Sequence, residues 1–133
     1  MNVISNHFDL LHFTECIFEK PVILGAKIII PTHQIGLLPS HPLNQTSELI
    51  FLPQCCLIFE QVKKSVRQLT GYVEESPGSG EFKPSSDLKR TVIDDSFPIV
   101  DEPVTLFEIE GIFQNPLEWV DWEIESAAFY LLD

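Results

Sequence analysis

The sequence predicts a mainly β protein, either an antiparallel β-sandwich or a partly closed barrel, with at most one short helix. Three observations predict this class: apolar residues alternate with polar ones, the candidate strands are mostly short, and turn-forming residues separate them. With 133 residues, of which 44% are hydrophobic, the chain can bury one core. We therefore expect a single β-rich domain over residues 1–133, with loops at about 31–47 and 74–88.

The N-terminal part is expected to form strands interrupted by prolines. Residues 7–18 alternate as a strand does, and after Pro21 a β-branched run over 22–30 suits a strand buried on both faces. Residues 31–47 contain three prolines and a glycine, and this composition predicts a long connection. The connection has room for a short strand around 35–38.

The middle of the chain leaves one element open. Residues 48–52 and 55–62 are predicted strands that Pro53 separates. In residues 62–72, VKKSVRQLTGY, the apolar side chains recur at helical spacing, yet the same residues also suit a strand followed by a bulge. A Pro-Gly-Ser-Gly stretch then predicts a loop.

The last third gives the clearest strand patterns. A short strand is expected at 89–94, followed by a connection over 98–103. In residues 105–113, Phe107, Ile109 and Phe113 share one face while Glu108 and Glu110 lie on the other. Gly111 marks a bulge or a place where another group approaches the backbone closely.

Residues 120–132 show the same alternation. Trp122 and Ile124 lie on one side, and the acidic residues Asp121, Glu123 and Glu125 lie on the other. The apolar parity then changes, which predicts a bulge near Ser126-Ala127 that redirects the strand. Between the two strands, Gln114-Asn115-Pro116 predicts a turn.

Charge is distributed unevenly along the chain. The formal net charge is −12, yet residues 1–73 hold five acidic and five basic residues. The whole excess therefore lies in residues 74–133, and from Thr91 onward there are eleven acidic residues and no Lys or Arg. Because these acids are interleaved with aromatic and branched residues, they do not form a disordered acidic tail.

Charge and hydropathy argue against several partners and locations. Nucleic-acid binding uses clustered Lys and Arg, and an anionic membrane surface would repel this chain. The first 16 residues lack the basic start of an export signal, and the most apolar run is too short to span a bilayer, so we expect a cytoplasmic protein. Cys16, Cys55 and Cys56 are an odd number, which fits buried thiols in a reducing compartment.

Catalytic and metal-binding spacings are missing from the sequence. No histidine or cysteine pair has the spacing of a zinc site, and no serine lies in a glycine-flanked elbow between a strand and a helix. Paired carboxylates do occur, and these fit glycosidase-type chemistry, calcium binding or simple exposure to solvent. The pairs are Asp94/Asp95, Asp101/Glu102, Glu108/Glu110 and Glu123/Glu125. We expect a protein that is not an enzyme and that uses no cofactor and no metal.

The C-terminal acids predict a surface for a basic protein partner. Carboxylates gathered on one sheet face repel each other, and a docked basic surface relieves that repulsion. Tryptophan is a frequent interface anchor, although packing against the core and plain solubilising charge are the alternatives. The predicted partner-binding residues are Asp94, Asp95, Asp101, Glu102, Glu108, Glu110, Glu118, Trp119, Asp121, Glu123 and Glu125.

Two segments resemble small uncharacterised bacterial β-proteins. They are residues 57–62, LIFEQV, with their basic continuation, and residues 119–125, WVDWEIE, with Phe129. Some proteins of this kind resemble immunity proteins, which neutralise a cognate toxin made by the same or a neighbouring cell, and the chain is similar to them. The resemblance implies a cytoplasmic acidic inhibitor that covers the active site of a basic toxin, often a nuclease. It implies no site residues at fixed positions.

Two other kinds of function fit the same sequence. A small-molecule or carbohydrate-binding β-module, or a weak hydrolase that uses one carboxylate pair, would require a pocket lined by Trp or Tyr with convergent carboxylates. A subunit of a larger assembly would instead carry a large apolar surface patch.

Overall fold

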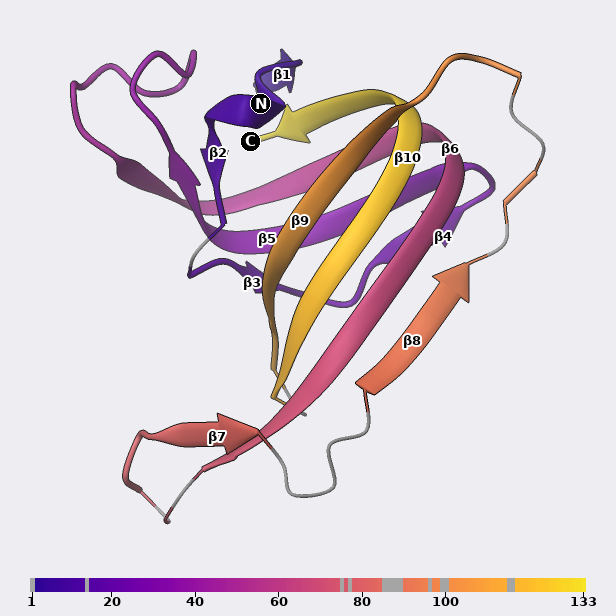
Figure 1. The fold of residues 1–133 in the computed structure, drawn as a ribbon. Coiled ribbons are helices and arrows are strands. Elements are labelled where there is room, and N and C mark those ends of the chain that lie inside the picture. Colours follow the sequence, from indigo (N-terminus) through magenta and orange to yellow (C-terminus); the bar gives the residue numbers. More distant parts are fainter. Residues whose placement is uncertain are drawn as a thin grey trace.

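The chain folds almost entirely into β-strands, as a computed structural model shows (Figure 1). The described residues are 2–13, 15–74, 76, 78–84, 90–95, 97–98, 101–114 and 117–133, with the backbone alone described at 74, 82–84 and 90. The strands are β1 (Val3–Ser5), β2 (Leu11–His12), β3 (Ile17–Phe18), β4 (Val22–Leu24), β5 (Lys27–Leu37), β6 (Ile50–Glu74), β7 (Phe82–Pro84), β8 (Arg90–Asp95), β9 (Thr105–Phe113) and β10 (Glu118–Leu132). Among these residues the helical element is a short 3-10 helix, η1 (Phe8–Leu10).

The central strands form a ring, which confirms the predicted fold class. β10 pairs with β9 on one edge and with β6 on the other, β6 pairs with β5, and β5 pairs with β3, all antiparallel. β3 then returns to β9 in a parallel pairing of only two residue pairs, Ile17 with Ile112 and Phe18 with Phe113. The sheet is therefore a partly closed barrel, joined along most of its circuit and weakly joined between β3 and β9 (Figure 1).

β6 is the longest strand, with 25 residues, and it holds the ring together. Its first half pairs with β5, and its second half lies between β10 and β8. Residues 62–72 belong to this strand, so the helical alternative for them is wrong. The strand alternative is correct, but the bulge precedes most of the segment instead of following it: Glu125 pairs with Lys64 and Ser126 with Val62, which leaves Lys63 as an extra residue. Neighbours on both edges satisfy the backbone without a helix.

Two prolines that were predicted to end strands lie within strands instead. β6 runs through Pro53 because residues 50–55 pair only with β5, so an open edge there requires no N–H from proline. β5 likewise runs through Pro31, whose carbonyl accepts a hydrogen bond from the Glu19 N–H at 2.9 Å. The predicted loop at 31–47 is therefore wrong over its first part, since β5 extends to Leu37.

The N-terminal predictions are wrong in two further places. Residues 7–18 are not one strand but contain η1, β2 and β3, because Asn6 and His7 adopt left-handed backbone angles. The run 22–30 is not one strand buried on both faces. Gly25, at φ 59°, turns the chain into a hairpin of β4 and β5, and all three residues of β4 are exposed at the edge.

The C-terminal predictions are largely confirmed. β8, β9 and β10 lie where strands were expected, and the register of β10 against β6 shifts between Glu125 and Ser126, at the predicted bulge. The predicted loop at 74–88 contains the short strand β7, which pairs with the end of β6. Parts of that loop, and the turn residues Asn115 and Pro116, lie outside the described residues.

Aromatic side chains fill the interior of the barrel. Trp122 is 1% exposed and lies edge-on to Phe18, with 6.3 Å between ring centroids. η1 contributes Phe8, whose ring centroid lies 4.9 Å from that of Phe107 and 5.2 Å from that of Phe129. The 3-10 helix therefore covers the phenylalanine-rich end of the core, close to where the N- and C-terminal segments pair (Figure 1).

Gly111 of β9 is a close-approach site, as one of its two predicted roles required. A Cβ atom at this position would lie 2.5 Å from Cε2 of Phe18, on the strand across the weak joint. The joint between β3 and β9 therefore depends on a residue without a side chain.

Replacing this glycine should destabilise the protein. Gly111→Ala forces Phe18 or β3 to shift, and we expect a loss of about 2 kcal/mol in the free energy of unfolding. Urea denaturation measures this loss. Gly71→Ala in β6 is the matched control, because a Cβ there meets no atom within 4 Å. Equal effects of the two changes would contradict a close approach at Gly111.

The loop between β5 and β6 contains a buried histidine. His41 is 2% exposed, its ring lies 6.1 Å from that of His7, and its Nδ1 accepts a hydrogen bond from the Leu43 N–H at 3.1 Å. Burial lowers the pKa of His41, and the neighbouring His7 lowers it further. The folded protein therefore favours the neutral imidazole.

The stability of the fold should fall in mild acid. The unfolded chain protonates this histidine at its ordinary pKa of about 6.5, so stability present above that pH is lost as the pH falls below it. Urea denaturation between neutral pH and the onset of carboxylate titration should show that the free energy of unfolding of the parent chain falls as the pH falls. His41→Asn, which keeps a hydrogen-bond acceptor for Leu43, should make the free energy of unfolding depend less on pH. An unchanged pH dependence would contradict the lowered pKa of His41.

Candidate functional site

Five carboxylates gather on the outer face of β9 and β10, and we call this set the acidic face. Alternation along the two strands places Ile109, Val120, Trp122 and Ile124 in the core. The residues between them point the other way. The acidic face consists of Glu108 and Glu110 on β9 and Asp121, Glu123 and Glu125 on β10.

The register sets like charges directly opposite each other. Asp121 pairs with Glu110, and Glu123 pairs with Glu108. Like charges in directly opposed positions destabilise a sheet, by about 0.2 to 1 kcal/mol per pair. In the described strand pairings, only Glu125 has a cation as its cross-strand neighbour, Lys64 on β6. The acidic face therefore costs stability where strand pairing could have placed opposite charges together.

The described cations with ion pairs lie elsewhere. Among the described residues, ion pairs join Lys27 to Glu60 and Arg67 to Asp95, and His33 Nε2 lies 3.0 Å from Glu19 Oε2. None of these pairs includes a member of the acidic face. The local negative potential is thus left for solvent or for a binding partner.

Apolar side chains extend this surface across β6 and β8. Val66 of β6 pairs with Glu123 on one side and Asp94 of β8 on the other, so Asp94 continues the same face. Val92 of β8 is 61% exposed and Leu106 of β9 is 50% exposed. The surface therefore mixes carboxylates with accessible apolar groups.

Trp119 lies at one end of the acidic face. It has the same parity as Asp121, and its indole Nε1 donates a hydrogen bond to Asp121 Oδ1 at 3.3 Å. Its side chain is half-buried, whereas Trp122 belongs to the core. The two tryptophans thus have different environments, one at the surface and one inside.

Four of the predicted site residues do not join this surface. Glu118 has the parity of Val120, on the opposite side of β10. Asp101 and Glu102 are exposed and precede β9, outside any strand. Asp95 lies on the inner face of β8, opposite Ser65, and its carboxylate accepts a hydrogen bond from the Ser65 hydroxyl.

Asp95 belongs to a polar network that the sequence patterns did not predict. Trp122 Nε1 donates a hydrogen bond to Ser65 Oγ at 2.8 Å, and Ser65 Oγ donates to Asp95 Oδ2 at 3.3 Å. Arg67 Nη2 lies 3.4 Å from the same carboxylate oxygen, and the guanidinium lies 4.9 Å from the Trp122 ring centroid. This arrangement pairs the charge of Arg67, so that the arginine can lie beside the core.

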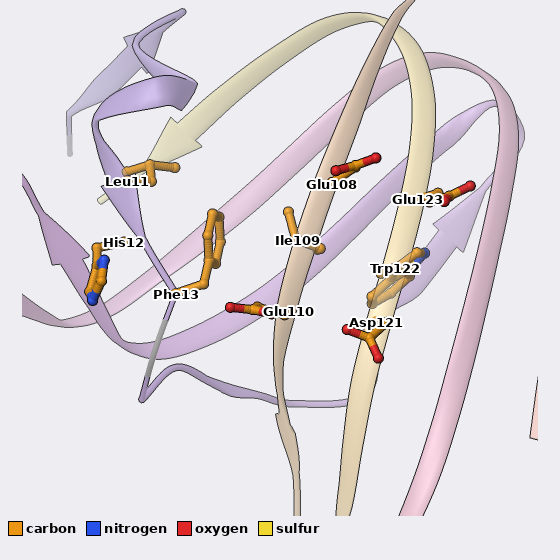
Figure 2. A pocket seen from close by; sticks show the side chains of 9 residues that line it. All are labelled: Leu11, His12, Phe13, Glu108, Ile109, Glu110, Asp121, Trp122 and Glu123. Carbon is orange, nitrogen blue, oxygen red and sulfur yellow. The ribbon is translucent and has the colours of Figure 1, made fainter. Parts of the chain in front are cut away.

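A groove runs along the acidic face to the N-terminal segment (Figure 2). Its volume is about 510 Å³, and it is lined by Leu11, His12, Phe13, Glu108, Ile109, Glu110, Asp121, Trp122 and Glu123. Figure 2 shows His12 and Phe13 on the N-terminal segment across from β9. Their part in this groove has no signal in the sequence, because it depends on long-range packing.

Metal-ligand clusters and the buried cysteines are two further kinds of candidate site in the described residues. No group of three or more His, Cys, Asp or Glu side chains among them could hold a metal ion. Burial raises the pKa of the Cys55 thiol to about 12, and burial also raises that of Cys16. These thiols are therefore protonated and weakly nucleophilic at neutral pH.

No protein-family model, no curated protein and no solved structure matches the chain. Within the described part of the chain, no helix has the length and apolarity needed to cross a membrane. The function is therefore inferred from the chemistry of the acidic face and its groove.

Reversing one charge on the acidic face should stabilise the fold. In Glu123→Lys, the new ammonium lies opposite Glu108 and replaces a repulsion by an attraction, so we expect a gain of about 1 kcal/mol at low salt. Urea denaturation at low and high salt measures this gain. Glu48→Lys, in the loop before β6, changes the net charge equally away from the face. Equal gains in both variants would show that net charge, and not the cross-strand register, is responsible.

Proposed function

We propose that this chain is a binding protein that docks its acidic face on a basic surface of another protein. More specifically, we propose an immunity-type inhibitor that covers the active site of a basic toxin. The observation that carries the proposal is the register of β9 and β10, which sets Asp121 against Glu110 and Glu123 against Glu108.

Plain solubilising charge does not require this arrangement. Solubility needs only net charge and is served equally well by alternating signs or by scattered acids. A sheet that opposes like charges loses stability in the free protein. A basic partner removes that penalty on docking, so part of the repulsion becomes a gain in affinity and in association rate.

The composition of the surface also supports a protein partner. Protein interfaces combine aromatic and aliphatic groups with a polar, charged rim. Here Trp119, Val92 and Leu106 are accessible beside the carboxylates. Neither a metal nor a phosphate-bearing ligand would use those apolar groups in this way.

A toxin that acts on nucleic acid offers a suitable surface. Its active site must hold a polyanion with clustered Lys and Arg. Closely spaced carboxylates on a rigid sheet present the same sign of charge as the phosphates of such a substrate. A protein that carries them can occupy that site and exclude the substrate.

Binding to the partner should depend on the acidic face and on salt. The chain is used to isolate a partner from its native host, and the purified pair is then measured by calorimetry and by assay of the partner's activity. Neutralising Glu108, Glu110, Asp121 and Glu123 to Gln or Asn should weaken binding about 100-fold or more, because charge pairs at interfaces contribute strongly. Rising salt should weaken the parent complex.

The control keeps the net charge of the test variant. It neutralises four exposed acids that lie away from the acidic face, Asp9, Glu15, Glu48 and Glu81. Equal losses in both variants, or binding indifferent to salt, would overturn the docking proposal. A basic partner that binds through the acidic face but keeps its activity would overturn the inhibitor part alone.

A further inference from the structure

We propose that the open edge of β9 receives an extended segment of the partner as an added β-strand, in which basic and apolar residues alternate. This inference rests on the proposed function, because it specifies how the basic partner meets the acidic face. It adds a backbone contact and a sequence pattern to what charge alone implies.

β9 is paired along its full length on one edge only. β10 pairs with it from Thr105 to Phe113. On the other edge, β3 pairs with Ile112 and Phe113, and no described strand pairs with residues 105–110. That edge presents backbone N–H and C=O groups in the spacing of a strand, which is a template for another strand.

The groove keeps this edge accessible. Its far wall is formed by Leu11, His12 and Phe13, and β2 is paired to β5 at Leu37 and Gly36, not to β9 (Figure 2). A strand added to a sheet lies about 4.8 Å from its neighbour, so it would lie within this groove. The N-terminal segment would then flank the added strand on its other side.

The two sides of the groove differ in chemistry. Toward the outside, Glu108 and Glu110 line it, and the Glu110 carboxylate points toward the N-terminal segment (Figure 2). Toward the core, Ile109 and Phe13 line it, and Phe13 packs against Phe8 with 5.7 Å between ring centroids. Because side chains alternate along a strand, the best occupant has Lys or Arg at every second position and apolar residues between them.

A second copy of this chain is a poor occupant. Two β9 edges paired with each other would place Glu108 and Glu110 of both copies on one surface, which adds further repulsion. The same acids admit a basic strand. The open edge is therefore protected against self-association while it remains available to a partner of opposite charge.

The test uses three peptides with alternating Lys and Val. One is unmodified. The second carries a methyl group on the backbone nitrogen of every Lys, and the third carries one on the backbone nitrogen of every Val. In a strand, the N–H groups of the Lys residues point to one edge and those of the Val residues point to the other. If β9 pairs with the peptide, one methylated peptide should lose binding about tenfold or more while the other keeps it.

Hydrogen exchange of the protein locates the contact. On binding of the unmodified peptide, backbone amides in residues 105–110 should gain protection, and the variant with Glu108→Gln and Glu110→Gln should bind more weakly. No binding of the unmodified peptide, equal affinities of the two methylated peptides, or protection only outside these residues would overturn strand addition.

The outcomes separate this inference from the proposed function. If the two methylated peptides bind equally and their binding still requires the carboxylates and low salt, the acidic face remains the docking surface and only strand addition fails. If the partner isolated from the host binds independently of the acidic face, the proposed function fails whatever the peptides do.

Discussion

The pairing register of β10 is the constraint on which the rest of the structure depends. A shift of one residue would move Trp122 and Ile124 to solvent and bring carboxylates into the core, at a large cost in free energy. Burial of these side chains therefore fixes β10 against both β6 and β9. Once this register is set, the intervening acids must lie outside, and those of β9 and β10 must face each other. The charge repulsion is a consequence of the core, which outweighs it.

Acidic residues have different surroundings on the inner and outer faces of the sheet formed by β6, β8, β9 and β10. Inside, the carboxylate of Asp95 is matched by the Ser65 hydroxyl and the Arg67 guanidinium. Outside, the carboxylates oppose each other, and the ion pairs of the described residues lie elsewhere. Water screens the outer charges, so their repulsion is tolerable, whereas an unpaired charge inside would not be. The free protein can thus keep a strongly negative surface without losing its fold.

Incomplete closure of the barrel links the fold to its proposed binding mode. The β3–β9 joint has only two residue pairs and depends on the close approach of Phe18 to Gly111. Beyond this joint no described strand pairs with that edge of β9, and Phe8 packs against Phe107 and Phe129 on the core side. A barrel closed all round would bury the edge and leave charge alone to recognise a partner. The gap adds backbone hydrogen bonding to the same surface.

Alternation along the chain determined the fold class, the core residues of β9 and β10 and the side on which Glu108 and Glu123 lie, because period two follows from strand geometry alone. It did not determine the course of β6 through Pro53, where proline is tolerated because, among the described strands, only β5 pairs with residues 50–55. Only the tertiary structure decided that Asp95 points inward and that Phe13 faces β9, because both depend on segments distant in sequence. The local sequence pattern thus determines on which face of a strand a side chain lies, and long-range strand pairing determines which residues it contacts.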